Sequence, residues 1–413
     1  MKRTRIGLFG IFGIRNIGNE CTLQAMLHNV RVRLPDADIF SICYVPEDTA
    51  QRYALQAVPV SAAYTRQAGS SGATRRRSRA ARLFRGLFRR LPAEFADWFR
   101  VFKILRGTDM LAMTGTGMLT DYNTSWSGYP YDIFKWTLAA KMAGCRVLFV
   151  GVGVGPIHER LSRILIRHAL ILAGYRSYRD TMSKARLEQL GLDTSEDQVF
   201  PDLAFSLPES SLPASRARQD RKRIVGLGVM EHVDIHRGGQ PVRERLHDAY
   251  LTKMCDFAEW LLERGYGIRI LQGDMDYDRA VRRNLRTKLE GRGINYSDAG
   301  IVDDDVATVG DLLDQLAGVD VVVSPRFHNL ILGLMLNKPI ISLSYDPKSD
   351  ALLESIGLGD YCQNIDDVEL DLLISQFNDL EARSEELKTM IFQRVGAYRD
   401  RLKQQYQLIL GGI

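Results

Sequence analysis

Short apolar runs that end in glycine or in a polar turn alternate with helical patterns along most of this chain. A strand buried on both faces has a continuous apolar run, and a helix returns the chain for the next parallel strand, so the alternation predicts an α/β fold with parallel sheets. We expect strands at residues 5–12, 38–45, 109–113, 146–152, 175–179, 223–229, 267–272, 319–324 and 339–344. We expect helices at residues 21–34, 131–143, 161–173, 180–190, 246–264, 276–289, 308–317 and 325–336, and a charged helical tail over 368–410.

The chain is long enough for two domains. Its 413 residues exceed the size that one hydrophobic core usually reaches, and the alternation restarts after a polar stretch near residue 210. We predict two Rossmann-like domains facing a cleft, at residues 1–210 and 220–365, and a helical C-terminal tail at 366–413. The five cysteines are scattered, and no run of about 20 uncharged apolar residues could span a bilayer, so we expect a cytoplasmic protein.

A basic insertion at residues 65–105 interrupts the first domain. Eight arginines and no acid lie between Arg75 and Arg90, and the rest of the chain is slightly acidic, which argues against a nucleic-acid partner. Apolar side chains recur beside them at helical spacing: Leu83, Phe84, Leu87, Phe88, Leu91, Trp98, Phe99 and Phe102. The segment from Arg75 to Phe102 is either an interfacial helix on the anionic inner face of the plasma membrane or a helix docked on its own domain.

Glycine-rich turns follow several of the expected strands. Gly115 and Gly117 lie in one, residues 151–155 read GVGVG, and the segment NIGNE begins at Asn16. Glycine lets a backbone approach a ligand closely, but plain strand-to-helix turns use it as well. The asparagines Asn16 and Asn19 suit the cap of the helix that follows. No GxxxxGK[ST] occurs, so we expect no P-loop nucleotide site.

The segment VVVSPRFH points most directly to a binding site. Ser324 suits the N-cap of a helix and Pro325 its first position, which would place Arg326 and His328 in the first helical turn. A cation there opposes the helix dipole by a few tenths of a kcal/mol to about 1 kcal/mol. An anionic ligand bound at the helix start would offset this cost and would explain the cation.

Two further cations repeat this placement. In SYDPK, Asp346 is the expected cap and Lys348 lies just inside the helix, while Arg179 directly precedes another helix. All three cations follow parallel strands, where α/β domains bind their ligands, so together they predict a site for a doubly charged anion such as phosphate.

His328 is the only one of seven histidines at these turns. Beside Arg326 and Lys348 it suits proton transfer; its alternative role is to cap or pack under the loop. His232 and His236 have no Glu or Cys partner at metal-ligand spacing, and the stretch DMDYD at 274–278 lacks the later Glu of a calcium loop. We therefore expect no metal, and we interpret these aspartates as caps and surface charge.

An ordered set of segments resembles the bacterial polysaccharide pyruvyl transferase family. The segments are NIGNE at 16–20, TGTGMLTD at 114–121, GVGVGPI at 151–157, YRD at 178–180 with Ser183, Pro201-Asp202, SPRFHNLILGL at 324–334 and SLSYDPK at 342–348. They lie between residues 10 and 360, so the resemblance spans most of the chain. Two positions differ from the usual family pattern: Asn19 replaces an aspartate, and Thr116 replaces the middle glycine of a GGG.

The resemblance implies a glycosyltransferase B-like architecture and transfer of the enolpyruvyl group of phosphoenolpyruvate onto two hydroxyls of a sugar. By position, Arg179, Arg326 and Lys348 resemble the donor-binding cations, and His328 resembles the catalytic residue. The acceptor side falls to the N-terminal domain, with Asn16, Asn19, Gly115, Gly117 and Asp121. Phosphoenolpyruvate is then a co-substrate, no cofactor is expected, and we expect a lipid-linked acceptor.

Two other functions remain open. A glycosyltransferase with a nucleotide sugar would typically show two glutamates eight residues apart near residues 328–336, where HNLILGLML has no acid. A non-catalytic, membrane-associated scaffold in polysaccharide assembly would explain the basic insertion. It would not explain three cations at helix starts.

Overall fold

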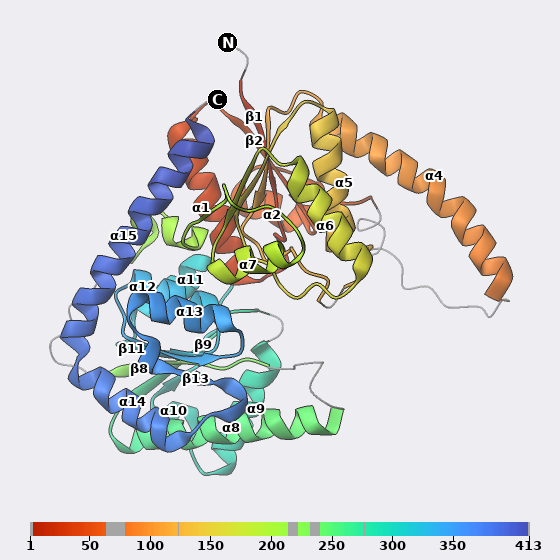
Figure 1. The fold of residues 1–413 in the computed structure, drawn as a ribbon. Helices are drawn as coiled ribbons and strands as arrows, with labels where there is room; N and C mark the ends of the chain where they lie inside the picture. Colours follow the sequence, from red (N-terminus) through yellow and green to blue (C-terminus); the bar gives the residue numbers. More distant parts are fainter. Residues whose placement is uncertain are drawn as a thin grey trace. The chain divides into compact units, whose positions relative to one another are not determined.

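The computed structural model describes residues 3–62, 79–122, 124–213, 222–231, 240–275 and 278–411. Residues 63–78 of the predicted insertion, His232, His236 and Asp276 lie outside this part of the chain. The chain forms two compact units (Figure 1). The first comprises Met1–Ile14, Thr22–Leu203 and Gln404–Ile413, and the second comprises Arg15–Cys21 and Ala204–Lys403.

A seven-stranded parallel sheet forms the centre of the first unit, in the order β3-β2-β1-β4-β5-β6-β7. The strands are β1 (Arg5–Phe9), β2 (Asp38–Cys43), β3 (Gln56–Pro59), β4 (Met110–Thr114), β5 (Arg146–Val152), β6 (Tyr175–Tyr178) and β7 (Gln198–Val199). All of β4 and all of β5 after Arg146 are buried, as the apolar runs predicted for strands covered on both faces.

Helices follow nearly every strand of this sheet: α1 (Ile17–Arg33), α2 (Pro46–Tyr53), α4 (Arg79–Leu105), α5 (Tyr129–Met142), α6 (Arg160–Leu172) and α7 (Thr181–Gln189). Helix α5 packs against α6 and against the part of α4 from Glu94 on, and we call these helices the α4–α5–α6 layer (Figure 1). Trp136 of α5 is fully buried; its ring centroid lies 6.1 Å from that of Phe9, and its indole N–H donates to the Val60 carbonyl (2.9 Å).

The second unit is built on a six-stranded parallel sheet in the order β10-β9-β8-β11-β12-β13. Its strands are β8 (Ile224–Gly228), β9 (Gly267–Leu271), β10 (Ile301–Val302), β11 (Val321–Ser324), β12 (Ile340–Ser344) and β13 (Cys362–Asn364). Its helices are α8 (Gln240–Glu263), α9 (Asp278–Gly291), α10 (Tyr296–Ala299), α11 (Val309–Ala317), α12 (Phe327–Met335), α13 (Pro347–Ile356), α14 (Leu370–Ala382) and α15 (Ser384–Leu410).

Two short segments leave the unit in which their sequence neighbours lie. Residues Arg15–Cys21, which include the first turn of α1, belong to the second unit, and Gln404–Ile413, at the end of α15, belong to the first. Within the first unit, Gln405 donates to Ser177 Oγ of β6 (2.7 Å). The sequence-based boundaries at residues 210 and 366 do not show this exchange, because periodicity does not tell on which unit a segment packs.

The predicted fold class, two Rossmann-like parallel-sheet domains with a helical C-terminal region, is confirmed. The predicted start of the first helix at Cys21 is wrong, since α1 begins at Ile17, and so is the start of a helix at Pro325, since α12 begins at Phe327. The sequence does not predict strands β3, β7, β10 and β13; each has two to four residues, too few to show a periodicity. None of the described helices is long and apolar enough to cross a membrane.

Candidate functional site

The turn after β11 brings an arginine and a histidine to the carboxyl end of the second sheet. All of β11 is buried, and Ser324 Oγ accepts hydrogen bonds from the Arg326 backbone N–H (3.2 Å) and from Asn329 Nδ2 (3.2 Å). Ser324 thus makes the side-chain bond expected of an N-cap, but the helix itself begins only at Phe327. Arg326 takes the N-cap position with extended backbone (φ −80°, ψ 116°), and His328 remains in the first turn of α12.

Arg326 is held by a buried carboxylate. Its guanidinium pairs with Oδ1 of Asp278, which is fully buried at the start of α9. Burial alone lowers the pKa of Arg326, but the Asp278 charge outweighs it and the net pKa is raised, so Arg326 stays a cation. Its Nε is buried and has no hydrogen-bond partner among the described residues. Arg326 therefore keeps a donor that the described part of the chain does not use.

The glycine at Gly273 makes room for this arginine. A Cβ atom there would lie 2.8 Å from Cγ of Arg326 and 3.0 Å from its Cβ and Cδ. These atoms form the stem of the side chain, which cannot move away without moving the turn. Gly273 and Asp278 thus fix the arginine from two directions.

His328 packs against the segment that starts α1. A Cβ atom at Gly18 would collide with the imidazole of His328, so glycine is required where the ring approaches the helix. The ring of Phe327 meets the imidazole edge-on, at 5.4 Å between centroids. The NIGNE segment, a family motif near the start of the chain, therefore lies beside the histidine of a motif some 300 residues later.

Asn16 fastens this segment to the second unit. Its Nδ2 donates to Asp274 Oδ2 (3.0 Å), and its Oδ1 accepts from the backbone N–H groups of Gly18 (3.1 Å) and Asn19 (3.3 Å). The expected capping by Asn16 is confirmed, although the helix starts earlier than predicted. Asn16 and Asn19, predicted for the acceptor side with the N-terminal domain, lie in the second unit with His328.

Lys348 reaches the same group of residues from α13. Asp346 caps the helix by accepting from the Lys348 backbone N–H (3.0 Å), with Pro347 in the first position, as predicted. The ammonium lies 3.4 Å from Asp346 Oδ2, 5.1 Å from the ring centroid of Tyr345 and 5.6 Å from that of Phe327. Since Phe327 is the chain neighbour of both Arg326 and His328, we call Arg326, His328 and Lys348 the cationic cluster.

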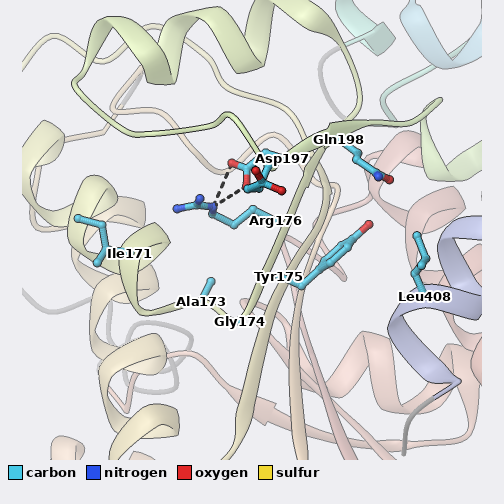
Figure 2. Close-up of a pocket in the computed structure, with 9 residues that line it drawn as sticks. Ile171, Ala173, Gly174, Tyr175, Arg176, Asp197, Gln198 and Leu408 are labelled. Carbon is cyan, nitrogen blue, oxygen red and sulfur yellow. Dashed lines mark hydrogen bonds and ion pairs between the residues drawn. The ribbon is translucent and has the colours of Figure 1, made fainter.

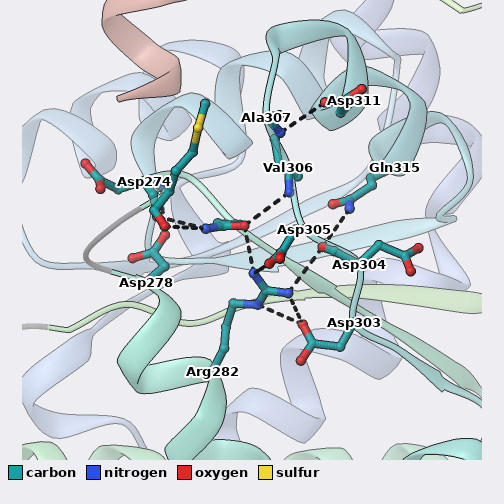
Figure 3. Close-up of polar contacts among 12 residues, drawn as sticks. Asp274, Asp278, Arg282, Asp303, Asp304, Asp305, Val306, Ala307, Asp311 and Gln315 are labelled. Carbon is teal, nitrogen blue, oxygen red and sulfur yellow. Dashed lines mark hydrogen bonds and ion pairs between the residues drawn. The ribbon is translucent and has the colours of Figure 1, made fainter. Parts of the chain in front are cut away.

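A second layer of polar contacts, absent from the sequence-based predictions, holds the turn after β9 (Figure 3). Arg282 of α9 pairs with Asp303 and with Asp305 (2.9 Å) and donates to Gln272 Oε1 (2.7 Å). The amide of Gln272 donates to the carbonyls of Asp274 (3.2 Å) and Met275. Asp278 completes it by accepting the N–H groups of Gly273 and Asp274 (2.8 and 2.9 Å).

The sequence hints at this layer only through the stretch DMDYD. The pattern predicts caps and surface charge for its aspartates, and for Asp274 and Asp278 the surface role is wrong, since both side chains are buried. No local pattern shows that the start of α9 meets the turn after β11, so the pairing of Asp278 with Arg326 could not be predicted.

Arg179 lies in the first unit, in a turn of similar design. It follows β6 and precedes Asp180, which caps α7 by accepting from the Ser183 N–H (2.6 Å). Its Nη1 lies 3.2 Å from Oδ2 of the buried Asp202, and a Cβ atom at Gly153 would lie 2.5 Å from its Nε. Asp202 and Gly153 therefore place this guanidinium.

The remaining predicted residues also lie in the first unit. A Cβ atom at Gly115 would lie 2.5 Å from the Gly151 carbonyl oxygen, which makes this glycine a requirement of close strand packing, whereas Gly117 has open space. Asp121 accepts the N–H groups of His158 (2.8 Å) and Glu159 (2.7 Å). Burial alone raises the pKa of Asp121, but these bonds outweigh it and the net pKa is lowered.

Thr116, which differs from the usual family pattern, makes a hydrogen bond that joins two segments of the first unit. Its hydroxyl accepts the N–H of Ile11 at 3.3 Å, and so links the turn after β4 to the chain after β1. The threonine that replaces the usual glycine therefore holds the turn after β4 in place.

A cavity of about 470 Å³ lies elsewhere in the first unit (Figure 2). Tyr175 and Gln198, the first residues of β6 and β7, line it, together with Leu408 and the ion pair of Arg176 with Asp197 (3.0 Å). It thus opens at the amino ends of these strands, whereas Arg179 follows the carboxyl end of β6. The cavity contributes no residue to either arginine turn.

Comparisons with known proteins found a matching family and a relative. A model of the polysaccharide pyruvyl transferase family matches residues 16–347. The amylovoran biosynthesis protein AmsJ of Erwinia amylovora is 20% identical over 270 residues, which cover 63% of this chain and 64% of that protein. The match therefore spans just under two thirds of the relative's length.

Solved structures show the fold. A UDP-N-acetylglucosamine 2-epimerase aligns with a TM-score of 0.58 and 10% identity over 99% of this chain and 97% of its own. The lipopolysaccharide outer core galactosyltransferase WaaB aligns with a TM-score of 0.54 and 12% identity over 99% and 100% of the two chains. At such identities the likeness concerns the fold alone, and it confirms the predicted glycosyltransferase B-like architecture.

Proposed function

Because the chain belongs to the polysaccharide pyruvyl transferase family, we propose that it moves the enolpyruvyl group of phosphoenolpyruvate onto two hydroxyls of one sugar. The products are a pyruvate ketal and free phosphate, and the sugar belongs to an exopolysaccharide or a cell-surface glycan precursor, which we expect to be lipid-linked. Family membership and the similarity to AmsJ support a role in polysaccharide biosynthesis.

The cationic cluster is the observation on which the donor assignment rests. Phosphoenolpyruvate has a phosphate and a carboxylate on three carbons, and Arg326 and Lys348 offer cations from two consecutive strand-to-helix turns. A guanidinium suits bidentate contact with either anion, and the unused Nε of Arg326 is available for one such bond. Arg179 would add a third donor-binding cation from the first unit.

His328 would serve the proton transfers of the reaction. A proton is added to the methylene carbon of the donor, and one sugar hydroxyl attacks the resulting oxocarbenium carbon and loses its own proton. The bond to the phosphate oxygen then breaks, and the second hydroxyl closes the ketal with loss of another proton. An imidazole in the first turn of α12 can act in these steps as acid or as base, because its ordinary pKa lies near neutral pH.

The cations also provide the electrostatic part of catalysis. Negative charge collects on the departing phosphate, and cations already held by Asp278, Asp346 and the turn backbones need no rearrangement to meet it. The proposed reaction requires no cofactor besides phosphoenolpyruvate. For the acceptor side we propose Gly115, Gly117 and Asp121, together with Asn16 and Asn19, which lie in the second unit.

Calorimetric titration with phosphoenolpyruvate, beside a UDP-sugar, tests the donor assignment. We expect binding of phosphoenolpyruvate only, since α12 (FHNLILGLM) has no acidic residue of the kind that a nucleotide-sugar transferase would use. Binding of the UDP-sugar alone would favour a glycosyltransferase, and binding of neither would favour the non-catalytic scaffold. Release of phosphate together with a ketal-modified sugar, detected by mass spectrometry, would establish the reaction.

A further inference from the structure

The outer side of the α4–α5–α6 layer in the first unit has a composition that the transfer reaction does not explain. Helix α4 is fastened through one side: Asp97, Val101 and Leu105, at four-residue spacing, are buried. On its other side Phe95 and Phe99 are 75% and 71% exposed. Burying two such rings would be favourable, so this side of α4 is suited to an apolar partner.

Helix α6, in the same layer, shows the same character. Leu161, Ile164 and Ile171 are exposed at helical spacing. Arg160 and Arg163 are exposed on either side of Leu161, and the helix RLSRILIRHALIL has no acidic residue after its N-cap, Glu159. Two helices that both pack on α5 thus present apolar and basic side chains together.

The acidic residues of α4 do not offset this charge. Glu94 and Asp97 both bind Lys135 of α5, whose ammonium lies 3.1 Å and 2.7 Å from their carboxylates. The side chains of Lys135 and Asp97 are 1% and 4% exposed, so this pair lies in the layer's interior, and Glu94, which is 42% exposed, is paired with the same lysine. Earlier in α4, the sequence has five arginines from Arg79 to Arg90 and no acid.

We propose that this side of the layer binds an anionic phospholipid bilayer, with its apolar side chains at the headgroup boundary and its arginines against lipid phosphates. A bilayer offers both chemistries to two parallel helices at once, and no spanning helix is needed. Pairing of two copies through this face would oppose arginine to arginine, and a nucleic acid would leave the apolar side chains without a partner. The bilayer is the partner that satisfies both sets of residues.

The test is co-sedimentation of the full chain with phosphatidylcholine vesicles, with and without phosphatidylglycerol. We expect binding only to the anionic vesicles and its loss at high salt, because arginine–phosphate attraction is screened. Phe95→Ser/Phe99→Ser and Arg160→Glu/Arg163→Glu should each reduce the bound fraction at least about fivefold. A deletion of residues 79–91 tests the arginine-bearing part of α4 in the same way.

Phe392→Ser is the matched control, since Phe392 is 72% exposed on α15 of the second unit and should leave vesicle binding unchanged. Melting curves check that every variant folds. The proposal is wrong if the intact protein ignores anionic vesicles at low salt, or if the variants bind as well as the parent. It is also wrong if light scattering shows a dimer that Phe95→Ser/Phe99→Ser dissociates while vesicles are not bound.

Discussion

The two units hold an arginine after a strand by the same means, but the residues after the arginine differ. Arg179 pairs with the buried Asp202 and lies against Gly153; Arg326 pairs with the buried Asp278 and lies against Gly273. In each case a carboxylate fixes the charge and a glycine makes space for the side chain. Placing a guanidinium at the carboxyl end of a parallel sheet thus requires partners from other turns of that sheet.

The residues next in the chain separate the two turns. After Arg179 comes Asp180, an ordinary N-cap, and then Thr181. Arg326 itself takes the N-cap position, and the residue two places later is His328. Only the second turn adds a group that can transfer protons near pH 7. We therefore propose binding for both turns and chemistry for the turn in the second unit.

The largest effect expected from this comparison is on turnover. His328→Gln should reduce kcat by about 10²–10⁴-fold while phosphoenolpyruvate binding survives, because a proton-transfer group acts mainly in the transition state. Rates come from phosphate release, and affinity comes from calorimetry. His168→Gln, an exposed histidine of α6, should behave as the parent protein. Near-normal turnover of His328→Gln would leave the residue a packing role only.

The next effect is on donor affinity. Arg326→Ala and Lys348→Ala should each weaken phosphoenolpyruvate binding by about 1.5–3 kcal/mol, the usual contribution of a charge-assisted hydrogen bond. Arg179→Ala should do the same if both turns meet the same ligand. The control is Arg286→Ala, an exposed arginine of α9 that pairs with Glu290. An unchanged affinity in Arg179→Ala alone would limit the donor site to the second unit.

The turns can be predicted from the sequence because their signals are local. The strand predicted at 146–152 matches β5 to the residue, and Asp346, Pro347 and Lys348 take the predicted cap positions. Buried apolar runs and capping side chains depend on neighbours a few residues away, so the pattern contains their cause. The predicted start of α12 is wrong by two residues, since the helix begins at Phe327, although Ser324 accepts the N–H of Arg326 as a cap would.

The supporting residues could not be found in this way. Asp278 pairs with an arginine 48 residues later, and Gly18 packs on a histidine more than 300 residues later. Such pairs depend on strand order, because β9, β8 and β11 bring their turns to one edge of the sheet. Strand order is set by the packing of the whole unit. The family motif NIGNE is therefore visible in the sequence, whereas its partner is visible only in the fold.

Alanine substitutions at Gly153 and Gly273 compare the two turns through the free energy of unfolding. An alanine at Gly273 would press on the stem of Arg326, whereas one at Gly153 would meet the far end of the Arg179 side chain. We expect Gly273→Ala to lower the free energy of unfolding by about 1–3 kcal/mol, the usual cost of overpacking, and Gly153→Ala to cost less than about 1 kcal/mol. Urea denaturation measures both. Equal costs would mean that the two arginines are held with equal rigidity.

The last comparison is between Asp202 and Asp278, which are paired with arginines, and Asp132, which is buried beside a tyrosine and a lysine. Asp132 of α5 is buried, and its Oδ2 accepts the hydroxyl of Tyr44 at 3.2 Å. Burial raises the pKa of Asp132 from 3.8 to about 7, although the charge of Lys135 opposes the shift. The folded state therefore keeps the Asp132 proton to a higher pH than the unfolded state does. The protonated carboxyl contributes stability that is present below about pH 4 and is lost as the pH rises through about 7.

Asp132→Asn should remove this loss, because the amide stays neutral and its oxygen can still accept from Tyr44. Between about pH 5 and 8 the parent should lose at least about 1 kcal/mol more unfolding free energy than the variant, since one unit of pKa shift corresponds to about 1.4 kcal/mol. Urea denaturation at several pH values measures the difference. Asp36→Asn, an exposed carboxylate of the same unit, should keep the parent's pH dependence. If Asp132→Asn and the parent lose stability in parallel, Asp132 is already ionised in the folded protein at neutral pH, and its burial does not produce the expected pH dependence.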